Sequence, residues 1–260
     1  MEVVILESPE AIGVVVADVI SALLTRKPIA ALGLATGSSP LPIYSELIRR
    51  HRAGAISFAK SSAVLLDEYV GLPHDHEQTY RNVIEREFAG LVDFRAGGVQ
   101  GPDGLADDLL AECSRYDQMV VESAVDLQLL GIGSDGHIGF NEPSSSLASR
   151  TRLKTLTTQT RHDNARFFGG DASGVPAHVI TQGIGTVLEA RHLVMVAFGD
   201  GKSVAVGQMI EGPVAGMVPA SALQLHPHVT VVLDEPAASR LALSDFYRET
   251  SRLKPPWQPH

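Results

Sequence analysis

Residues 29–40 read Ile-Ala-Ala-Leu-Gly-Leu-Ala-Thr-Gly-Ser-Ser-Pro, an apolar run followed by a glycine- and hydroxyl-rich turn. The run at 29–35 is continuous rather than alternating, which is typical of a strand covered on both faces of its sheet. Similar runs occur at Val3–Leu6, Ala63–Leu66, Leu127–Gly131, Leu193–Phe198 and Val229–Leu233, and helical patterns lie between them at about 9–25, 40–52, 77–89, 104–122, 201–210 and 236–251. This alternation predicts an α/β fold, a doubly wound (Rossmann-like), mostly parallel sheet with helices on both faces.

Composition limits the classes of function. The chain has 260 residues, with 21 Lys and Arg against 30 Asp and Glu, so its formal net charge is −9. This balance argues against a nucleic-acid or anionic-membrane partner. The single cysteine, Cys113, excludes an internal disulfide. With no leader, no membrane-length apolar run and no linker, we expect one cytoplasmic domain over residues 1–260, with an irregular tail at 255–259.

Ligands of such sheets bind beyond the carboxyl ends of the strands, so the segments that follow the strands are the expected site. The first is the turn Thr36, Gly37, Ser38 and Ser39, before a helix that begins at Pro40. Glycine admits a ligand close to the backbone, hydroxyls donate hydrogen bonds, and a helix N-terminus favours anions. We predict a phosphate-binding loop; the alternative is an ordinary turn in which Ser39, like Ser8, caps a helix before a proline.

Two adjacent carboxylates, Asp67 and Glu68, follow the run Ala63–Leu66. A carboxylate at the end of a strand is suited to act as a general base. Neighbours on an extended chain point in opposite directions, so only one of the two is expected to face the site. A metal site made of Asp67, His74 and His76 and a helix-capping acidic loop are the alternatives.

Residues 131–143 read Gly-Ile-Gly-Ser-Asp-Gly-His-Ile-Gly-Phe-Asn-Glu-Pro. The first three glycines have the spacing of a dinucleotide-binding fingerprint, but that fingerprint opens a helix and carries an acid about 20 residues later. Here a proline follows, and basic residues occupy the position of the acid. The context therefore argues against a dinucleotide site.

The same segment carries Asp135, His137 and Glu142 within eight positions. Carboxylates beside a histidine orient its ring and tune its basicity near neutral pH. We therefore favour an acid–base histidine over a purely structural one. Lys202, which follows the strand Leu193–Phe198, and Arg166 are candidate cations for an anionic ligand, with ordinary surface positions as the alternative.

Several blocks resemble the glucosamine-6-phosphate deaminases. In order along the chain they are residues 32–40, 66–73, 131–143, 146–152, 181–186, 211–213 and 219–226. The most specific is Asp-Gly-His-Ile-x-Phe-Asn-Glu-Pro at 135–143, in which Gly139 stands where an alanine is common. The related 6-phosphogluconolactonases share Asp-Gly-His but usually continue differently.

The resemblance implies conversion of glucosamine 6-phosphate to fructose 6-phosphate and ammonia, without cofactor or metal. It implies that Asp67 moves a proton between C2 and C1, and that His137 opens the sugar ring with Asp135 and Glu142 as its partners. The family's phosphate-binding positions correspond to residues 36–39, Arg166 and Lys202.

Some members of this family are hexamers activated by N-acetylglucosamine 6-phosphate at a subunit interface. The residues of that site match Ser145, Arg152 and Lys154, whereas ungapped counting puts Arg248 at the position of its tyrosine. The resemblance thus leaves homo-oligomer formation and allosteric activation open. Alternatives within the fold are a 6-phosphogluconolactonase and a galactosamine-6-phosphate deaminase. Alternatives of a different functional class are a sugar-phosphate sensor without activity and a dinucleotide oxidoreductase.

Overall fold

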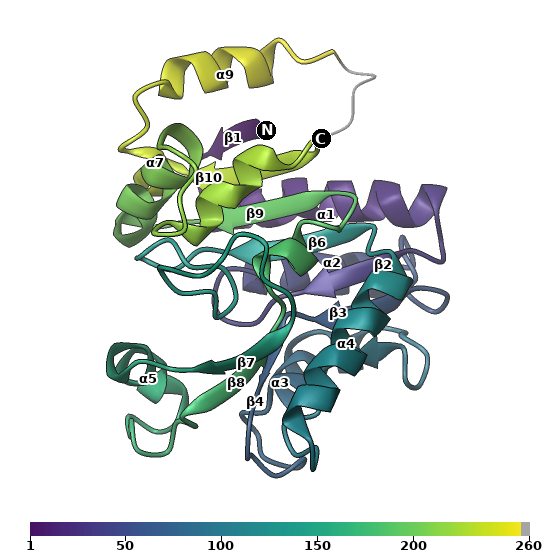
Figure 1. The fold of residues 1–260 in the computed structure, drawn as a ribbon. Helices are drawn as coiled ribbons and strands as arrows, with labels where there is room; N and C mark the ends of the chain where they lie inside the picture. The colour runs from purple at the N-terminus through teal and green to yellow at the C-terminus, as the bar shows by residue number, and fades with distance from the viewer. Residues whose placement is uncertain (256–260) are drawn as a thin grey trace.

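The computed structural model describes residues 1–255 and contains two sheets (Figure 1). The main sheet has seven parallel strands in the order β1-β10-β9-β6-β2-β3-β5. Their bounds are β1 (Glu2–Leu6), β2 (Ala31–Leu34), β3 (Ser62–Leu65), β5 (Val99–Gln100), β6 (Leu127–Gly131), β9 (Leu193–Ala197) and β10 (Val229–Asp234). All six strands predicted from the apolar runs are present, and β5 is an addition.

A second, antiparallel sheet has the order β4-β8-β7 and lies at one end of the main sheet (Figure 1). Its strands are β4 (Asp67–Tyr69), β7 (Arg152–Thr155) and β8 (His178–Thr181). The sequence did not predict this sheet because its strands are short and carry charged or polar residues. Only Leu66 separates β3 from β4, so the chain passes directly from one sheet into the other.

Helices cover both faces of the main sheet, which confirms the predicted fold class. One face packs against α1 (Pro9–Arg26), α2 (Leu41–Arg52) and α3 (Tyr80–Glu87). The other packs against α4 (Leu109–Ser123), α6 (Ile184–Val187) and α7 (Ser203–Glu211). In β9, Val194 and Val196 join the first core while Leu193, Met195 and Ala197 join the second, which explains why the apolar run is continuous.

Several predicted helix bounds were wrong. The pattern at 236–251 is divided into α8 (Glu235–Ala238) and α9 (Ser244–Arg252), because the Glu211 carboxylate accepts hydrogen bonds from the backbone N–H groups of Ala242 and Leu243 between them. The helix predicted from residue 104 begins at Leu109, after the N-cap Asp108. The remaining elements are α5 (Thr158–Asn164) and the 3-10 segments η1 (Ala89–Leu91), η2 (Ala165–Phe167), η3 (Asp200–Lys202) and η4 (Pro219–Leu225).

The two predicted serine caps differ in outcome. Ser8 caps α1 by accepting a hydrogen bond from the Ala11 N–H at 3.2 Å. The Ser39 cap was wrong, since Pro40 occupies the N-cap of α2 and no side chain caps that helix. Ser39 packs against Gly131 instead, where a methyl group would lie 3.2 Å from its Oγ.

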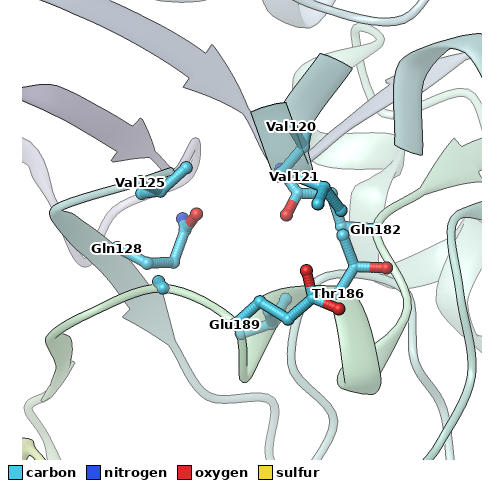
Figure 2. A pocket seen from close by; sticks show the side chains of 9 residues that line it. Val120, Val121, Val125, Gln128, Gln182, Thr186 and Glu189 are labelled. Atoms are coloured by element: carbon cyan, nitrogen blue, oxygen red, sulfur yellow. The ribbon is translucent and has the colours of Figure 1, made fainter. Parts of the chain in front are cut away.

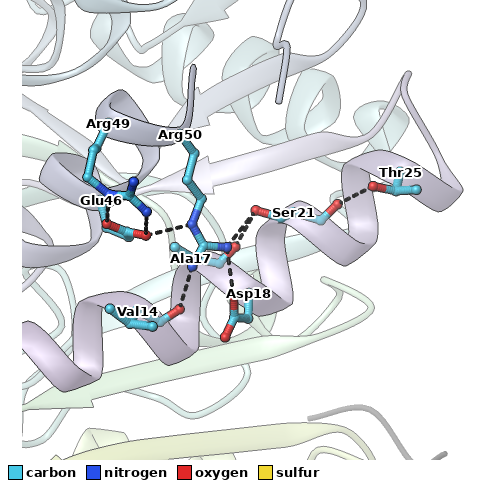
Figure 3. Close-up of polar contacts among 8 residues, drawn as sticks. All are labelled: Val14, Ala17, Asp18, Ser21, Thr25, Glu46, Arg49 and Arg50. Atoms are coloured by element: carbon cyan, nitrogen blue, oxygen red, sulfur yellow. Dashed lines mark hydrogen bonds and ion pairs between the residues drawn. The ribbon is translucent and has the colours of Figure 1, made fainter. Parts of the chain in front are cut away.

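Helices α1 and α2 are locked together (Figure 3). A methyl group on Gly13 would lie 2.6 Å from the carbonyl oxygen of Pro42, so the two backbones touch. Arg50 of α2 forms ion pairs of 2.7 Å with Asp18 of α1 and with Glu46. This contact fixes the start of α2 and with it the predicted phosphate loop.

The direction in which strands are added reverses between β2 and β6, which are neighbours in the sheet. Such a switch point is where doubly wound sheets bind ligands. The strands β3, β2, β6 and β9 are consecutive in the sheet and end at this edge. The segments that follow them carry predicted site residues. Among residues 1–255 no helix is long and apolar enough to cross a bilayer. Beyond Pro255, the predicted irregular tail lies outside the described residues.

Candidate active site

Asp67 is the first residue of β4 and pairs with Thr181 of β8. It is only 6 % exposed. Burial raises the pKa of Asp67 well above its ordinary value, and the nearby charge of Glu68 raises it further. Within residues 1–255 no hydrogen bond is made by the Asp67 carboxylate, which leaves its oxygens available to a ligand.

Glu68 has a structural role. Its carboxylate accepts hydrogen bonds from the backbone N–H groups of Tyr69, Tyr80 and Arg81 at 2.8, 2.9 and 3.0 Å. The last two belong to the first turn of α3, whose N–H groups lack partners inside the helix. The helix-capping alternative therefore applies to Glu68, and the two adjacent carboxylates have different tasks.

His137 lies on the glycine-rich loop that follows β6. Its Nδ1 is 2.6 Å from Asp135 Oδ1, which also accepts the backbone N–H of His137 at 3.1 Å. The hydrogen bond from His137 lowers the pKa of Asp135 to about 2, so this carboxylate is ionised and can only accept. Nδ1 therefore carries a proton, and Nε2 makes no hydrogen bond within residues 1–255.

Two glycines explain how the loop presents this ring. A methyl group at Gly133 would lie 2.2 Å from Nδ1 and Cε1 of His137, so the imidazole rests directly on that residue. Gly139 has φ +56, and a methyl group there would lie 3.0 Å from Thr181 Oγ1 and 3.4 Å from Asp67 Oδ2. The loop that carries His137 thus packs against the Asp67 carboxylate through Gly139.

Glu142 is placed differently from Asp135. Its carboxylate accepts a short hydrogen bond from the Thr160 hydroxyl of α5. In residues 1–255 no hydrogen bond joins Glu142 to His137, so its role as a partner of the histidine stays a prediction. Thr160 itself had no sequence signal, because α5 was not predicted.

The predicted phosphate residues lie on three segments. Residues 36–39 follow β2, with Gly37 at φ +90 and Ser39 against the start of the His137 loop. Lys202 ends η3, and Asp234 holds that turn by accepting the Gly199 N–H at 2.9 and 3.0 Å. Asp234 was not predicted as a site residue; its one signal was its place at the carboxyl end of a strand.

Two cations in this region lack carboxylate partners. Burial lowers the pKa of Lys202, and the charge of Arg166 lowers it further, while Asp135 acts in the opposite direction. The Arg166 guanidinium lies 4.7 Å from the ring centre of Phe167. Neither forms a salt bridge with any residue of the described chain. An unpaired, half-buried cation beside a second cation favours an anionic ligand.

The predicted allosteric residues form a partly buried group. Arg152 donates hydrogen bonds to Asn141 Oδ1 at 2.8 Å and to Ser145 Oγ at 3.3 Å. Burial lowers the pKa of Arg152. Lys154 lies two residues further along β7, on the same face as Arg152.

The alternative metal site is not assembled. His74 is 77 % exposed, and His76 Nδ1 accepts the backbone N–H of Gln78. In residues 1–255 no three His, Cys, Asp or Glu side chains are grouped to hold a metal ion.

Two cavities lie away from the site described above. One of about 40 Å³, between α4 and α6, is lined by residues that include Gln128, Gln182 and Glu189 (Figure 2). It is far smaller than the pockets that hold small-molecule ligands. The other, of about 570 Å³, lies at the amino ends of the strands, near Arg26 and His192. None of the predicted site residues lines either cavity.

Comparison with known proteins places this geometry in context. The model of the family "glucosamine-6-phosphate isomerases/6-phosphogluconolactonase" matches residues 8–232. A glucosamine-6-phosphate deaminase of Mycolicibacterium smegmatis is 62 % identical over 259 residues, covering 99 % of both chains. One of Streptomyces coelicolor is 58 % identical with the same coverage.

Solved structures share the fold. A protein described as a monomeric glucosamine-6-phosphate deaminase superposes with a TM-score of 0.89 at 41 % identity, covering 92 % of this chain and 100 % of that one. A 6-phosphogluconolactonase from Leishmania guyanensis superposes with a TM-score of 0.72 at 22 % identity, covering 91 % and 97 %. The second likeness is one of fold alone.

Proposed function

The chain belongs to the family of glucosamine-6-phosphate isomerases and 6-phosphogluconolactonases, and we propose that within it this enzyme is a glucosamine-6-phosphate deaminase. It converts glucosamine 6-phosphate and water to fructose 6-phosphate and ammonia. The observation that carries the proposal is the packing of the buried Asp67 carboxylate against the loop that presents the His137–Asp135 pair. Relatives at 55–62 % identity over almost the whole chain carry the same name.

Ring opening is the proposed task of His137. The pyranose opens when a proton reaches the ring oxygen and another leaves the anomeric hydroxyl. Asp135 holds the Nδ1 proton, so Nε2 is the atom that takes and returns protons on the sugar. The ionised Asp135 stabilises the imidazolium that forms between these two transfers.

Isomerisation is the proposed task of Asp67. In the open sugar, C2 lies between an aldehyde and an ammonium group, so its proton is unusually acidic. The Asp67 carboxylate takes that proton, and the electron pair of the C–H bond forms a C1–C2 double bond. The aldehyde oxygen takes the displaced C=O electron pair and a proton, which gives an enol, and the ammonium group gives up one proton. Return of the Asp67 proton to C1 then leaves a CH2OH group at C1 and an iminium group at C2. A raised pKa makes Asp67 a stronger base for this transfer than an ordinary aspartate.

Deamination follows from the iminium group. Water adds to C2, the C–N bond breaks, and the nitrogen leaves as ammonia, which gives the ketone of fructose 6-phosphate. Throughout, Lys202, Arg166 and the turn at 36–39 hold the phosphate, and the sugar spans the distance from these cations to Asp67.

The test is incubation of the purified protein with glucosamine 6-phosphate alone. We expect ammonia and fructose 6-phosphate in equal amounts, and neither product from Asp67→Asn. In deuterated water the product should carry deuterium at C1. Absence of both products with the wild-type protein would overturn the proposal.

The same assay with other substrates measures the substrate specificity. Galactosamine 6-phosphate differs at C4, and 6-phosphogluconolactone would be hydrolysed without release of ammonia. We expect turnover of each to be far below that of glucosamine 6-phosphate. Faster hydrolysis of the lactone would identify a lactonase instead.

The proposal also covers the cellular location of the enzyme, its oligomeric state and its allosteric activation. We propose a cytoplasmic enzyme, in keeping with its single, buried cysteine. Homo-oligomer formation is tested by light scattering, since one relative is described as monomeric. Activation through Ser145, Arg152 and Lys154 is tested by adding N-acetylglucosamine 6-phosphate to the ammonia assay.

A further inference from the structure

Asn141 is a buried amide on the loop that carries His137. It is 0 % exposed, and its Nδ2 donates hydrogen bonds to the carbonyl oxygens of Ile138 at 2.9 Å and of Gln182 at 2.8 Å. Its Oδ1 accepts a hydrogen bond from Arg152 at 2.8 Å. Both N–H groups and the oxygen of this amide are therefore engaged, and Ile138 is the residue next to His137.

Gln182, 1 % exposed, extends the network toward the base. Its backbone N–H donates to the carbonyl oxygen of Leu66 at 2.8 Å, and its side-chain Nε2 donates to that of Leu65 at 2.8 Å. The Tyr116 hydroxyl donates to the same Leu65 oxygen at 2.7 Å. Leu66 immediately precedes Asp67. The carbonyl groups of the two residues before the base, Leu65 and Leu66, therefore both accept hydrogen bonds from Gln182.

These contacts form one continuous path between the two proposed catalytic groups. Asn141 bonds the residue after His137 and also bonds Gln182, which bonds the residue before Asp67. We propose that Asn141 is a positioning residue that sets the Asp67 carboxylate and the His137 ring at the separation which one sugar molecule requires. The inference rests on the proposed function, in which both groups act on the same substrate.

The chemistry of the amide explains why this position carries asparagine. The two carbonyl oxygens of Ile138 and Gln182 need donors, while the Arg152 guanidinium needs an acceptor. Only an amide supplies both from one short side chain. An aspartate would place a carboxylate against two carbonyl oxygens, and an apolar residue would take one hydrogen bond from each of these three groups.

The primary test is Asn141→Leu, which keeps the branched shape of the side chain and removes its three hydrogen bonds. A misplacement of about 1 Å costs on the order of 100-fold in rate, so we expect kcat on glucosamine 6-phosphate to fall about 100-fold with little change in KM. An analogue without the C4 and C5 hydroxyls can close neither a furanose nor a pyranose ring, so it needs Asp67 but no ring opening. Exchange of its C2 proton should fall by less than about fivefold, because the carbonyl groups of Leu65 and Leu66, just before Asp67, keep their hydrogen bonds from Gln182.

A double-mutant cycle separates positioning from general loosening. In the His137→Gln background the separation of the two groups no longer matters, so Asn141→Leu should add less than about threefold. The matched control is Thr230→Val, which removes another buried hydrogen bond, that of Thr230 Oγ1 to His192 at 2.9 Å. Thr230 lies near the amino end of β10, so kcat should stay within about twofold of wild type.

Arg152→Met is the second variant, in case Asn141→Leu does not fold. It keeps the Asn141 side chain and removes the donor to its Oδ1, together with the longer hydrogen bonds to Ser145 Oγ and the Arg150 carbonyl oxygen, so we expect about a tenfold loss with the same preference for the ring-opened analogue. Equal losses on the closed sugar and the analogue, or full additivity with His137→Gln, would overturn the inference while wild-type turnover upholds the proposed function. A wild-type protein that releases no ammonia would overturn both.

Discussion

The imidazole of His137 rests on the Cα of Gly133, and no side chain larger than hydrogen fits beneath it. In Gly133→Ala a methyl group would stand 2.2 Å from the ring, so the ring must leave its hydrogen bond with Asp135. We expect kcat to fall about 100-fold or more, since the acid–base group loses its orientation. The ammonia assay measures this. Gly174→Ala is the control, because its nearest neighbours lie at 3.5 Å or more and activity should be unchanged.

Asp67 carries a second residue-scale prediction. Because burial raises its pKa in the folded protein, the folded state binds a proton more readily than the unfolded chain does. The cost of burying the charge is therefore present above the folded-state pKa and disappears as pH falls below the unfolded value of about 3.9. We expect Asp67→Asn to raise the free energy of unfolding at pH 8 by at least about 1 kcal/mol.

The measurement is urea unfolding of both proteins at pH 8 and near pH 4. The increase in the free energy of unfolding caused by Asp67→Asn should be smaller near pH 4 than at pH 8. An equal increase at the two pH values would exclude the buried charge of Asp67 as its cause. The activity of the wild type should fall with decreasing pH at a higher pH than an ordinary carboxylate would give, since the ionised form is the base.

At this scale the sequence predicted part of the site. Asp135 and His137 lie two positions apart on a glycine-rich loop, so their contact could be inferred from spacing. The contacts of Asn141 with Gln182 and of Glu142 with Thr160 could not, because they join residues far apart in the chain. Nothing in the local sequence distinguishes a buried, fully bonded amide from an exposed one.

At the scale of elements, the contact between α1 and α2 gives a testable consequence. Gly13→Ala would place a methyl group 2.6 Å from the Pro42 carbonyl and force the helices apart. We expect a loss of about 1–3 kcal/mol in stability. The KM for the sugar phosphate should also rise, because α2 begins just after the phosphate loop. Thermal unfolding and steady-state kinetics measure both effects.

Gly207→Ala is the matched control for this prediction. Gly207 also lies inside a helix, α7, but its nearest neighbour is the Arg240 carbonyl oxygen at 3.5 Å, an ordinary contact. Alanine should therefore stabilise the protein by about 0.5–1 kcal/mol through its helix propensity. A loss of stability in both variants would mean that helix glycines, rather than the close approach of α1 and α2, determine the result.

Elements with long apolar runs were predictable, and short polar ones were not. The continuous runs of β9 and β10 are covered on both faces, so their composition alone identifies them. β4 reads Asp-Glu-Tyr and β7 reads Arg-Leu-Lys-Thr, and each is a strand only because β8 pairs with it. Tertiary pairing of this kind leaves no periodicity in the sequence.

At the scale of the whole molecule, the net charge of −9 is compatible with an anionic ligand, because the local placement of cations such as Lys202 and Arg166, which we propose to bind the phosphate, decides where an anion binds. Fructose 6-phosphate at about 100 times its Kd should add about 2.7 kcal/mol to stability, or roughly 5–10 °C in Tm. Lys202→Met and Arg166→Met should each remove most of that shift. Arg49→Met, which breaks an exposed pair with Glu46, should retain it. An undiminished shift in both site variants would remove them from phosphate binding.

Four consecutive strands, β3, β2, β6 and β9, are followed in the chain by the proposed base, phosphate loop, histidine and lysine. Adjacent strands are about 4.8 Å apart, so the ends of β3 and β9 are separated by about 14 Å, a distance that the backbone hydrogen bonds of the sheet determine. Point substitutions change which side chain follows each strand, but they do not change the spacing between the strand ends. Adapting this fold to a longer or shorter sugar phosphate therefore requires new loops at the strand ends, because the spacing of the strands is set by the fold.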